Sequence, residues 1–134
     1  MVIVDSSVWV DFFNGRNTTH TAALAVFIND DTARAGDYIV MEVLRGFRSD
    51  KEHATATAFF GIIKSFQLLD LQRAARAADR YRALRKRGVT VRKPVDSLIA
   101  SYCIDEGHEL LAKDKDFLPY VKHFGLRLLP LPTT

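Results

Sequence analysis

Short apolar runs alternate with longer amphipathic stretches along this sequence. The runs are three or four residues long, which is typical of strands buried in a parallel sheet. They predict strands at residues 2–4, 33–35, 66–69, 109–112 and 126–129. Because helical stretches separate these runs, the pattern predicts an α/β fold with a central, mainly parallel sheet between two layers of helices.

Helices are predicted where apolar residues recur every three to four positions after a capping residue. They cover residues 6–13, 19–29, 38–47, 50–63, 71–87, 95–106 and 117–123. In the helix at 71–87, one stripe of residues is expected to be buried: Leu71, Ala74, Ala75, Ala78, Tyr81 and Leu84. Cys103 lies on a similar stripe of the helix at 95–106, so we expect it to pack in the core.

The length of 134 residues fits one domain, spanning 1–134, with one sizeable core. Hydrophobic residues make up 48% of the chain and charged residues 26%, as in globular proteins. No apolar run is long enough for a membrane span, and Asp5 interrupts the segment where a signal peptide would be apolar. With Cys103 as the single cysteine, a disulfide within the chain and a cysteine metal site are excluded. We therefore expect a cytoplasmic protein without a membrane association.

Positive charge is concentrated in one part of the sequence. Nine basic residues and one acid lie between Leu71 and Lys93, so the remaining chain is net negative although the whole carries +3. Four arginines spaced three, four and seven apart share one face of the predicted helix at 71–87 and are candidate RNA-phosphate contacts: Arg73, Arg76, Arg80 and Arg87. A solvated helix surface is the alternative interpretation.

Five acids stand in places that suggest chemistry. Asp5 and Asp114 follow predicted strands, Glu42 lies in an apolar helical stretch, and Asp96 opens a helix, with Asp116 close to Asp114. In an α/β sheet the carboxyl ends of the strands form the binding edge. Carboxylates can share such a cleft only if a cation offsets their repulsion, and an all-oxygen ligand set favours Mg²⁺ or Mn²⁺.

Each acid also has a structural interpretation. Asp96 could cap its helix, Asp5 could belong to a turn, and Asp114 and Asp116 could be turn acids. Other acids are assigned to helix caps and solvated surfaces: Asp11, Asp37, Asp70, Asp79 and Asp105.

Four segments in order resemble the PIN-domain ribonucleases of the VapC toxin type. They are DSSVWVD, MEVLRGF, VDSLIA and LLAKDKDF, and together they extend over nearly the whole chain. The resemblance implies a PIN-like α/β/α fold and places the family's acidic quartet on Asp5, Glu42, Asp96 and Asp114, with Asp116 as a frequent extra acid. The sequence departs from the family at Ala112, where a Thr or Ser is usual.

The resemblance further implies a Mg²⁺- or Mn²⁺-dependent endoribonuclease that inhibits translation and growth as the toxin of a toxin–antitoxin pair. Asp5, Asp96 and Asp114 would bind the metal with Asp116, Glu42 would act through water, and the RNA products would carry a 5′-phosphate and a 3′-hydroxyl. Expected partners are a second copy of the chain and a VapB-type antitoxin, whose tail would place a basic side chain in the acidic cleft.

Two other classes of protein are consistent with parts of the sequence. A phosphoaspartyl enzyme also places an Asp after its first strand, but Ser7 stands where a phosphatase of that kind needs a second acid. A non-catalytic nucleic-acid-binding module would use only the basic helix at 71–87.

Overall fold

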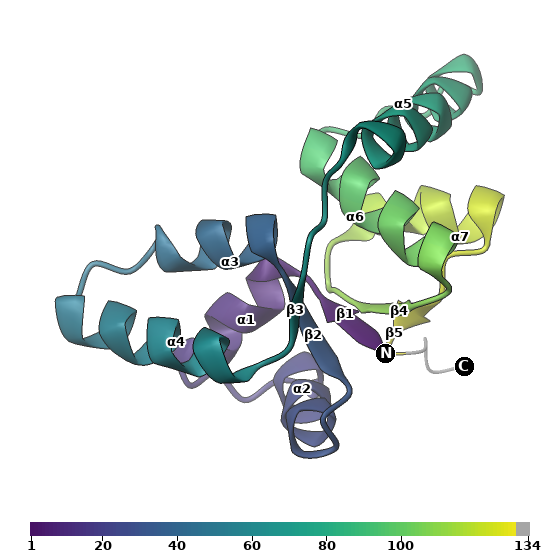
Figure 1. The fold of residues 1–134 in the computed structure, drawn as a ribbon. Coiled ribbons are helices and arrows are strands. Elements are labelled where there is room, and N and C mark those ends of the chain that lie inside the picture. Colours follow the sequence, from purple (N-terminus) through teal and green to yellow (C-terminus); the bar gives the residue numbers. More distant parts are fainter. Residues whose placement is uncertain (131–134) are drawn as a thin grey trace.

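A five-stranded parallel sheet forms the centre of the computed structural model, which describes residues 1–130 (Figure 1). Its strands are β1 (Val2–Val4), β2 (Ala33–Gly36), β3 (Ser65–Phe66), β4 (Glu109–Leu111) and β5 (Leu128–Leu129). They are ordered β3-β2-β1-β4-β5, and every pair is parallel. The central β1 aligns Ile3 with Arg34 on one side and with Leu110 on the other. The predicted parallel sheet is confirmed.

Seven helices and one short 3₁₀ turn connect the strands of the described chain. They are α1 (Ser6–Phe13), α2 (Thr19–Asn29), α3 (Asp37–Leu44), α4 (Asp50–Ile62), α5 (Leu71–Lys86), α6 (Pro94–Glu106), η1 (Lys115–Phe117) and α7 (Leu118–Phe124). Figure 1 shows α1, α3 and α4 on one side of the sheet and α6 and α7 on the other, with α5 beyond α6. The three-layer α/β/α prediction is therefore confirmed.

The core explains why the run that forms β1 is continuously apolar. All residues of β1 are buried, because helices cover both faces of the sheet. Beside it, the buried ring of Trp9 packs edge-on against the ring of Phe60, and their centroids are 5.1 Å apart. This contact joins α1 to α4. Cys103 is buried in the same core, as predicted, and burial raises the pKa of its thiol.

The prediction for the buried face of α5 is wrong at three positions. Leu71 is 86% exposed, and Ala75 and Ala78 are exposed as well, whereas Ala77 and Leu84 are buried. The physical reason is that α5 packs chiefly on α6 and extends away from the sheet, so only a narrow face of this helix is covered (Figure 1). An apolar stripe on a helix thus need not be covered within one chain.

No helix among residues 1–130 combines the length and the apolar character needed to span a bilayer.

Candidate active site

The candidate acids meet at the carboxyl edge of the sheet. Asp5 directly follows β1, Asp114 lies just beyond β4, Asp96 is in the first turn of α6, and Glu42 projects from α3. These four residues line one cavity of about 480 Å³, together with Ser6, Ser7, Val95 and the basic residues Arg92, Lys93, Lys113 and Lys115. The structure thus brings together four acids that are separated by up to 109 positions in the sequence.

Three of the carboxylates form a compact cluster. One oxygen each from Asp96, Asp114 and Asp116 lies within 4.8 Å of the others, a spacing that one metal ion can bridge. The geometry places the carboxylates of both Asp114 and Asp116 in this group. Asp5 and Glu42 border the same cavity outside the cluster.

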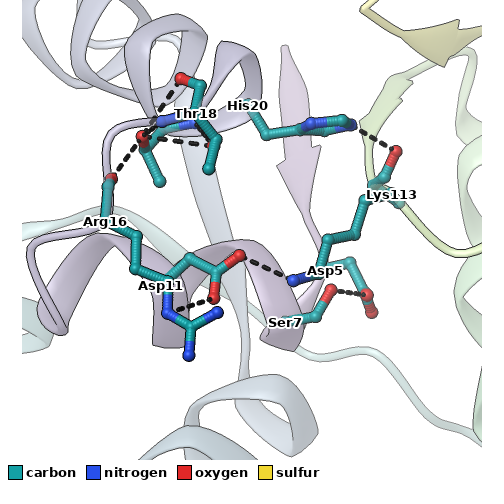
Figure 2. Close-up of polar contacts among 9 residues, drawn as sticks. Asp5, Ser7, Asp11, Arg16, Thr18, His20 and Lys113 are labelled. Atoms are coloured by element: carbon teal, nitrogen blue, oxygen red, sulfur yellow. Dashed lines mark hydrogen bonds and ion pairs between the residues drawn. The ribbon is translucent and has the colours of Figure 1, made fainter.

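Asp5 is held by the start of α1. Its carboxylate accepts a hydrogen bond of 2.8 Å from the Ser7 hydroxyl (Figure 2), and the side chain is almost fully buried. Burial raises the pKa of Asp5, only partly opposed by the hydrogen bonds from Ser6 and Ser7. An acid whose ionisation is disfavoured by burial in a cleft is typical of a functional site.

Asp96 does not cap its helix. Lys93 occupies the N-cap of α6 and makes no side-chain cap, whereas Asp96 lies three residues further, inside the first turn, and is only 4% exposed. Burial, with the neighbouring charges of Asp5 and Asp114, raises the pKa of Asp96 to about 7. Its Oδ2 is buried without a hydrogen-bond partner in the described chain, and the same holds for Oε1 of Glu42, whose pKa is raised by burial and by Asp5.

Asp114 and Asp116 are already balanced by cations. Asp114 caps η1 by accepting the Asp116 amide at 2.9 Å, and Lys93 Nζ lies 3.4 Å from its other oxygen. The amide hydrogen bond and Lys93 lower the pKa of Asp114. Asp116 in turn pairs with Arg92 at 3.3 Å. The site therefore combines Asp114, whose pKa is lowered, with three acids whose pKa values are raised: Asp5, Glu42 and Asp96.

The residues present fit a hard divalent cation. All candidate donors are carboxylate oxygens, and three of them are clustered. Asp96 and Glu42 each have a buried oxygen without a partner in the described chain, and both residues line the cavity together with Asp5. A divalent cation would stabilise the ionised forms of Asp5 and Asp96, whose pKa values are raised chiefly by burial and further by repulsion from nearby acids.

Two acids assigned to caps and solvated surfaces have other roles in the structure. Asp11 is buried, and its carboxylate accepts a hydrogen bond of 2.6 Å from Lys113. Asp105 is nearly buried between α5 and α6, where it pairs with Arg80 at 2.7 Å. Both assignments were wrong, because their partners lie 102 and 25 positions away and no local pattern signals such pairs.

The chain matches the PIN domain family over residues 2–122. It is 31% identical to ribonuclease VapC11 of Mycobacterium tuberculosis over 119 residues, which is 87% of this chain and 89% of the relative. This chain belongs to the PIN domain family. The structure is similar to VapBC2 of Rickettsia felis, solved bound to a promoter DNA fragment, with a TM-score of 0.73 and 16% identity over 96% of this chain and 97% of that one. It is also similar to DNA-bound VapBC of Salmonella typhimurium, with a TM-score of 0.71 and 18% identity over 95% of both chains.

The basic helix of this PIN domain is tied to its neighbours. Arg73 pairs with Glu106 at 2.8 Å, Arg76 and Arg80 pair with Asp105, and Arg87 contacts His123. The first three arginines do share one face, as their spacing predicts, but that face meets α6. Their contact with RNA phosphates stays a prediction.

The raised pKa of Asp96 predicts how the stability of this PIN domain depends on pH. Folding raises this pKa from its ordinary value of 3.8 to about 7, so the folded state binds the proton more tightly than the unfolded chain. The free energy of unfolding should therefore fall as the pH rises from 4 to 7. Thermal melts in EDTA between pH 5 and 8 should show this loss in the wild type and a weaker one in Asp96→Asn. If the melting temperatures of the two proteins changed with pH in parallel, Asp96 would not be the group whose pKa is raised.

Proposed function

We propose that this PIN domain is a Mg²⁺- or Mn²⁺-dependent endoribonuclease that acts as the toxin of a toxin–antitoxin pair. The observation that carries the proposal is the meeting of Asp5, Asp96, Asp114 and Asp116, from three different segments, at the carboxyl edge of the sheet. The names of the ribonuclease and VapBC relatives support the same activity and an antitoxin of the VapB type as the partner.

Each residue of the site has a role in this proposal. Asp5, Asp96 and Asp114 would hold the cation with Asp116, and Glu42 would orient the attacking water. When bound, the cation makes a water molecule more acidic and stabilises negative charge on the phosphate. Arg92 and Lys93 line the same cavity and would attract the RNA backbone. The Ser7 hydroxyl fixes the direction of the Asp5 carboxylate.

A second copy of the chain is the other proposed partner. The groove between α5 and α6, about 360 Å³ in volume, is lined largely by apolar residues, among them Leu69, Ala78, Tyr81 and Leu98. Exposed apolar surface of this kind is typical of protein–protein contacts. It supports a homodimer, to which the antitoxin would add to form a hetero-oligomer.

The alternative is a nucleic-acid-binding module without catalysis, based on the helix at 71–87. The ion pairs of Arg73, Arg76 and Arg80 with α6 weaken this alternative, because they engage the face that would have to bind phosphates.

Conditional expression in bacteria separates the two functions. Wild-type protein should arrest growth, and Asp5→Ala should not, because it removes a buried carboxylate of the site while leaving the basic helix unchanged. Asp79→Ala, at an exposed position of α5, is the matched control and should arrest growth like the wild type. Arrest by Asp5→Ala at equal protein level would favour the binding module.

A further inference from the structure

Lys113 differs from two other cations of the acidic cavity, Lys93 and Arg92. Lys93 and Arg92 pair with Asp114 and Asp116, which are acids of the proposed metal site. Lys113 immediately precedes Asp114 and lines the same cavity, yet its ammonium pairs with Asp11, an acid outside that site. Figure 2 shows Lys113 Nζ directed at the Asp11 carboxylate, while the Asp5 carboxylate turns toward Ser7.

The contact with Asp11 is short and joins a partly exposed lysine to a buried acid. The distance from Lys113 Nζ to Asp11 Oδ2 is 2.6 Å, and the Asp11 side chain is only 9% exposed. On the other oxygen, Arg16 Nε lies 3.7 Å away. A carboxylate in this position is screened little by solvent, so its attraction for the ammonium is larger than that of an exposed acid.

A contact with α2 holds the backbone next to Lys113. His20 Nε2, on α2, lies 3.1 Å from the carbonyl oxygen of Ala112 (Figure 2). The start of α2 is itself held by a capping box between Thr18 and Thr21. The lysine side chain therefore starts from a fixed point, and Asp11 determines where its ammonium lies.

We propose that Asp11 is a positioning residue that holds the Lys113 ammonium away from the candidate metal-binding acids and so keeps them available to the cation. Without Asp11, the flexible stem of Lys113 would let its charge turn toward the cluster, where Lys93 already reaches to 3.4 Å from Asp114. A second ammonium among the acids would compete with Mn²⁺ or Mg²⁺. This inference rests on the proposed function.

A double-mutant cycle on the purified full chain tests the inference, with free Mn²⁺ measured by electron paramagnetic resonance. Asp11→Asn should weaken Mn²⁺ binding about tenfold while Lys113 is present, and less than about twofold in the Lys113→Gln background. Lys113→Gln alone should bind Mn²⁺ at least as tightly as the wild type. The matched control is Asp31→Asn, which removes another Asp–Lys pair (Lys64, 3.0 Å) just before β2, at the amino edge of the sheet, and should not change the affinity.

The remaining outcomes overturn the inference in different ways. If Asp11→Asn lowers the Mn²⁺ affinity equally with Lys113 present and in the Lys113→Gln background, Asp11 acts only through its own charge. Weaker Mn²⁺ binding by Lys113→Gln alone would mean that the lysine anchors the Asp114 loop, and this arm is decisive even if Asp11→Asn does not fold. If neither the wild type nor Asp31→Asn binds Mn²⁺, the proposed function itself fails, and the inference fails with it.

Discussion

Replacing Asp96 with Asn should make the metal-free protein more stable at pH 8 and at the same time remove most of its response to Mn²⁺. The wild type holds an ionised, buried carboxylate beside Asp5 and Asp114 at this pH, because the pKa of Asp96 is about 7. Removing that charge should raise the free energy of unfolding by about 1–3 kcal/mol, which is several degrees in melting temperature.

The same substitution should nearly abolish RNA cleavage. Loss of a group that only orients a metal ligand typically lowers affinity or activity 10- to 100-fold, so loss of a ligand itself should exceed about a hundredfold. The wild type should be stabilised by Mn²⁺ in proportion to the logarithm of its concentration over Kd, and Asp96→Asn should lose most of this gain.

Thermal melts with and without Mn²⁺, beside a cleavage assay, measure both effects. Asp79→Asn, an exposed acid on α5, is the control for the change of charge. An Asp96→Asn protein that cleaves RNA normally and keeps the full Mn²⁺-dependent rise in melting temperature would remove Asp96 from the site.

The second large effect is expected for Arg80→Gln, which should destabilise the fold. The Arg80 guanidinium donates to Asp105 at 2.7 Å and to the Ser101 hydroxyl, and both charged side chains are more than four-fifths buried. After the substitution, Asp105 would keep only Arg76, at 3.4 Å. Leaving a buried carboxylate with one weak partner should cost about 2–3 kcal/mol, or roughly 10 °C in melting temperature.

The exposed Arg82 on the same helix provides the matched control, since Arg82→Gln should change the melting temperature little. Salt titrations of RNA binding by the two variants distinguish a structural from an RNA-binding arginine. If Arg80→Gln melts like the wild type but flattens the salt dependence by about 0.7 slope units, Arg80 contacts phosphate instead of supporting α6.

Much of the fold could be predicted because its signals are local. These signals lie within a few residues of the elements that they define. Examples are the buried run at Val2–Val4, the Asp70 cap that accepts the Arg73 amide at 2.8 Å, and the left-handed Gly107 that ends α6. The candidate acids could be found for a related reason, because charged residues at strand ends or in apolar stretches stand out from their neighbours.

The contacts that the sequence could not supply are those between distant segments. Asp11 occupies the second turn of an ordinary amphipathic helix, and only the folded chain brings Lys113 to it. The arginines of α5 look like a solvated or RNA-binding face until Asp105 and Glu106 at the end of α6 are placed opposite them. The spacing of two opposite charges that lie far apart in a sequence does not indicate whether they pair, because their pairing depends on tertiary structure.

Cleavage of RNA by the purified chain under control of a divalent cation tests the central claim most directly. The account predicts cleavage in Mn²⁺ or Mg²⁺, no cleavage in EDTA, recovery when the cation is restored in excess, and products that carry a 5′-phosphate. The clustered oxygens of Asp96, Asp114 and Asp116 are the reason to expect this dependence. Cleavage that continues unchanged in EDTA would contradict the account.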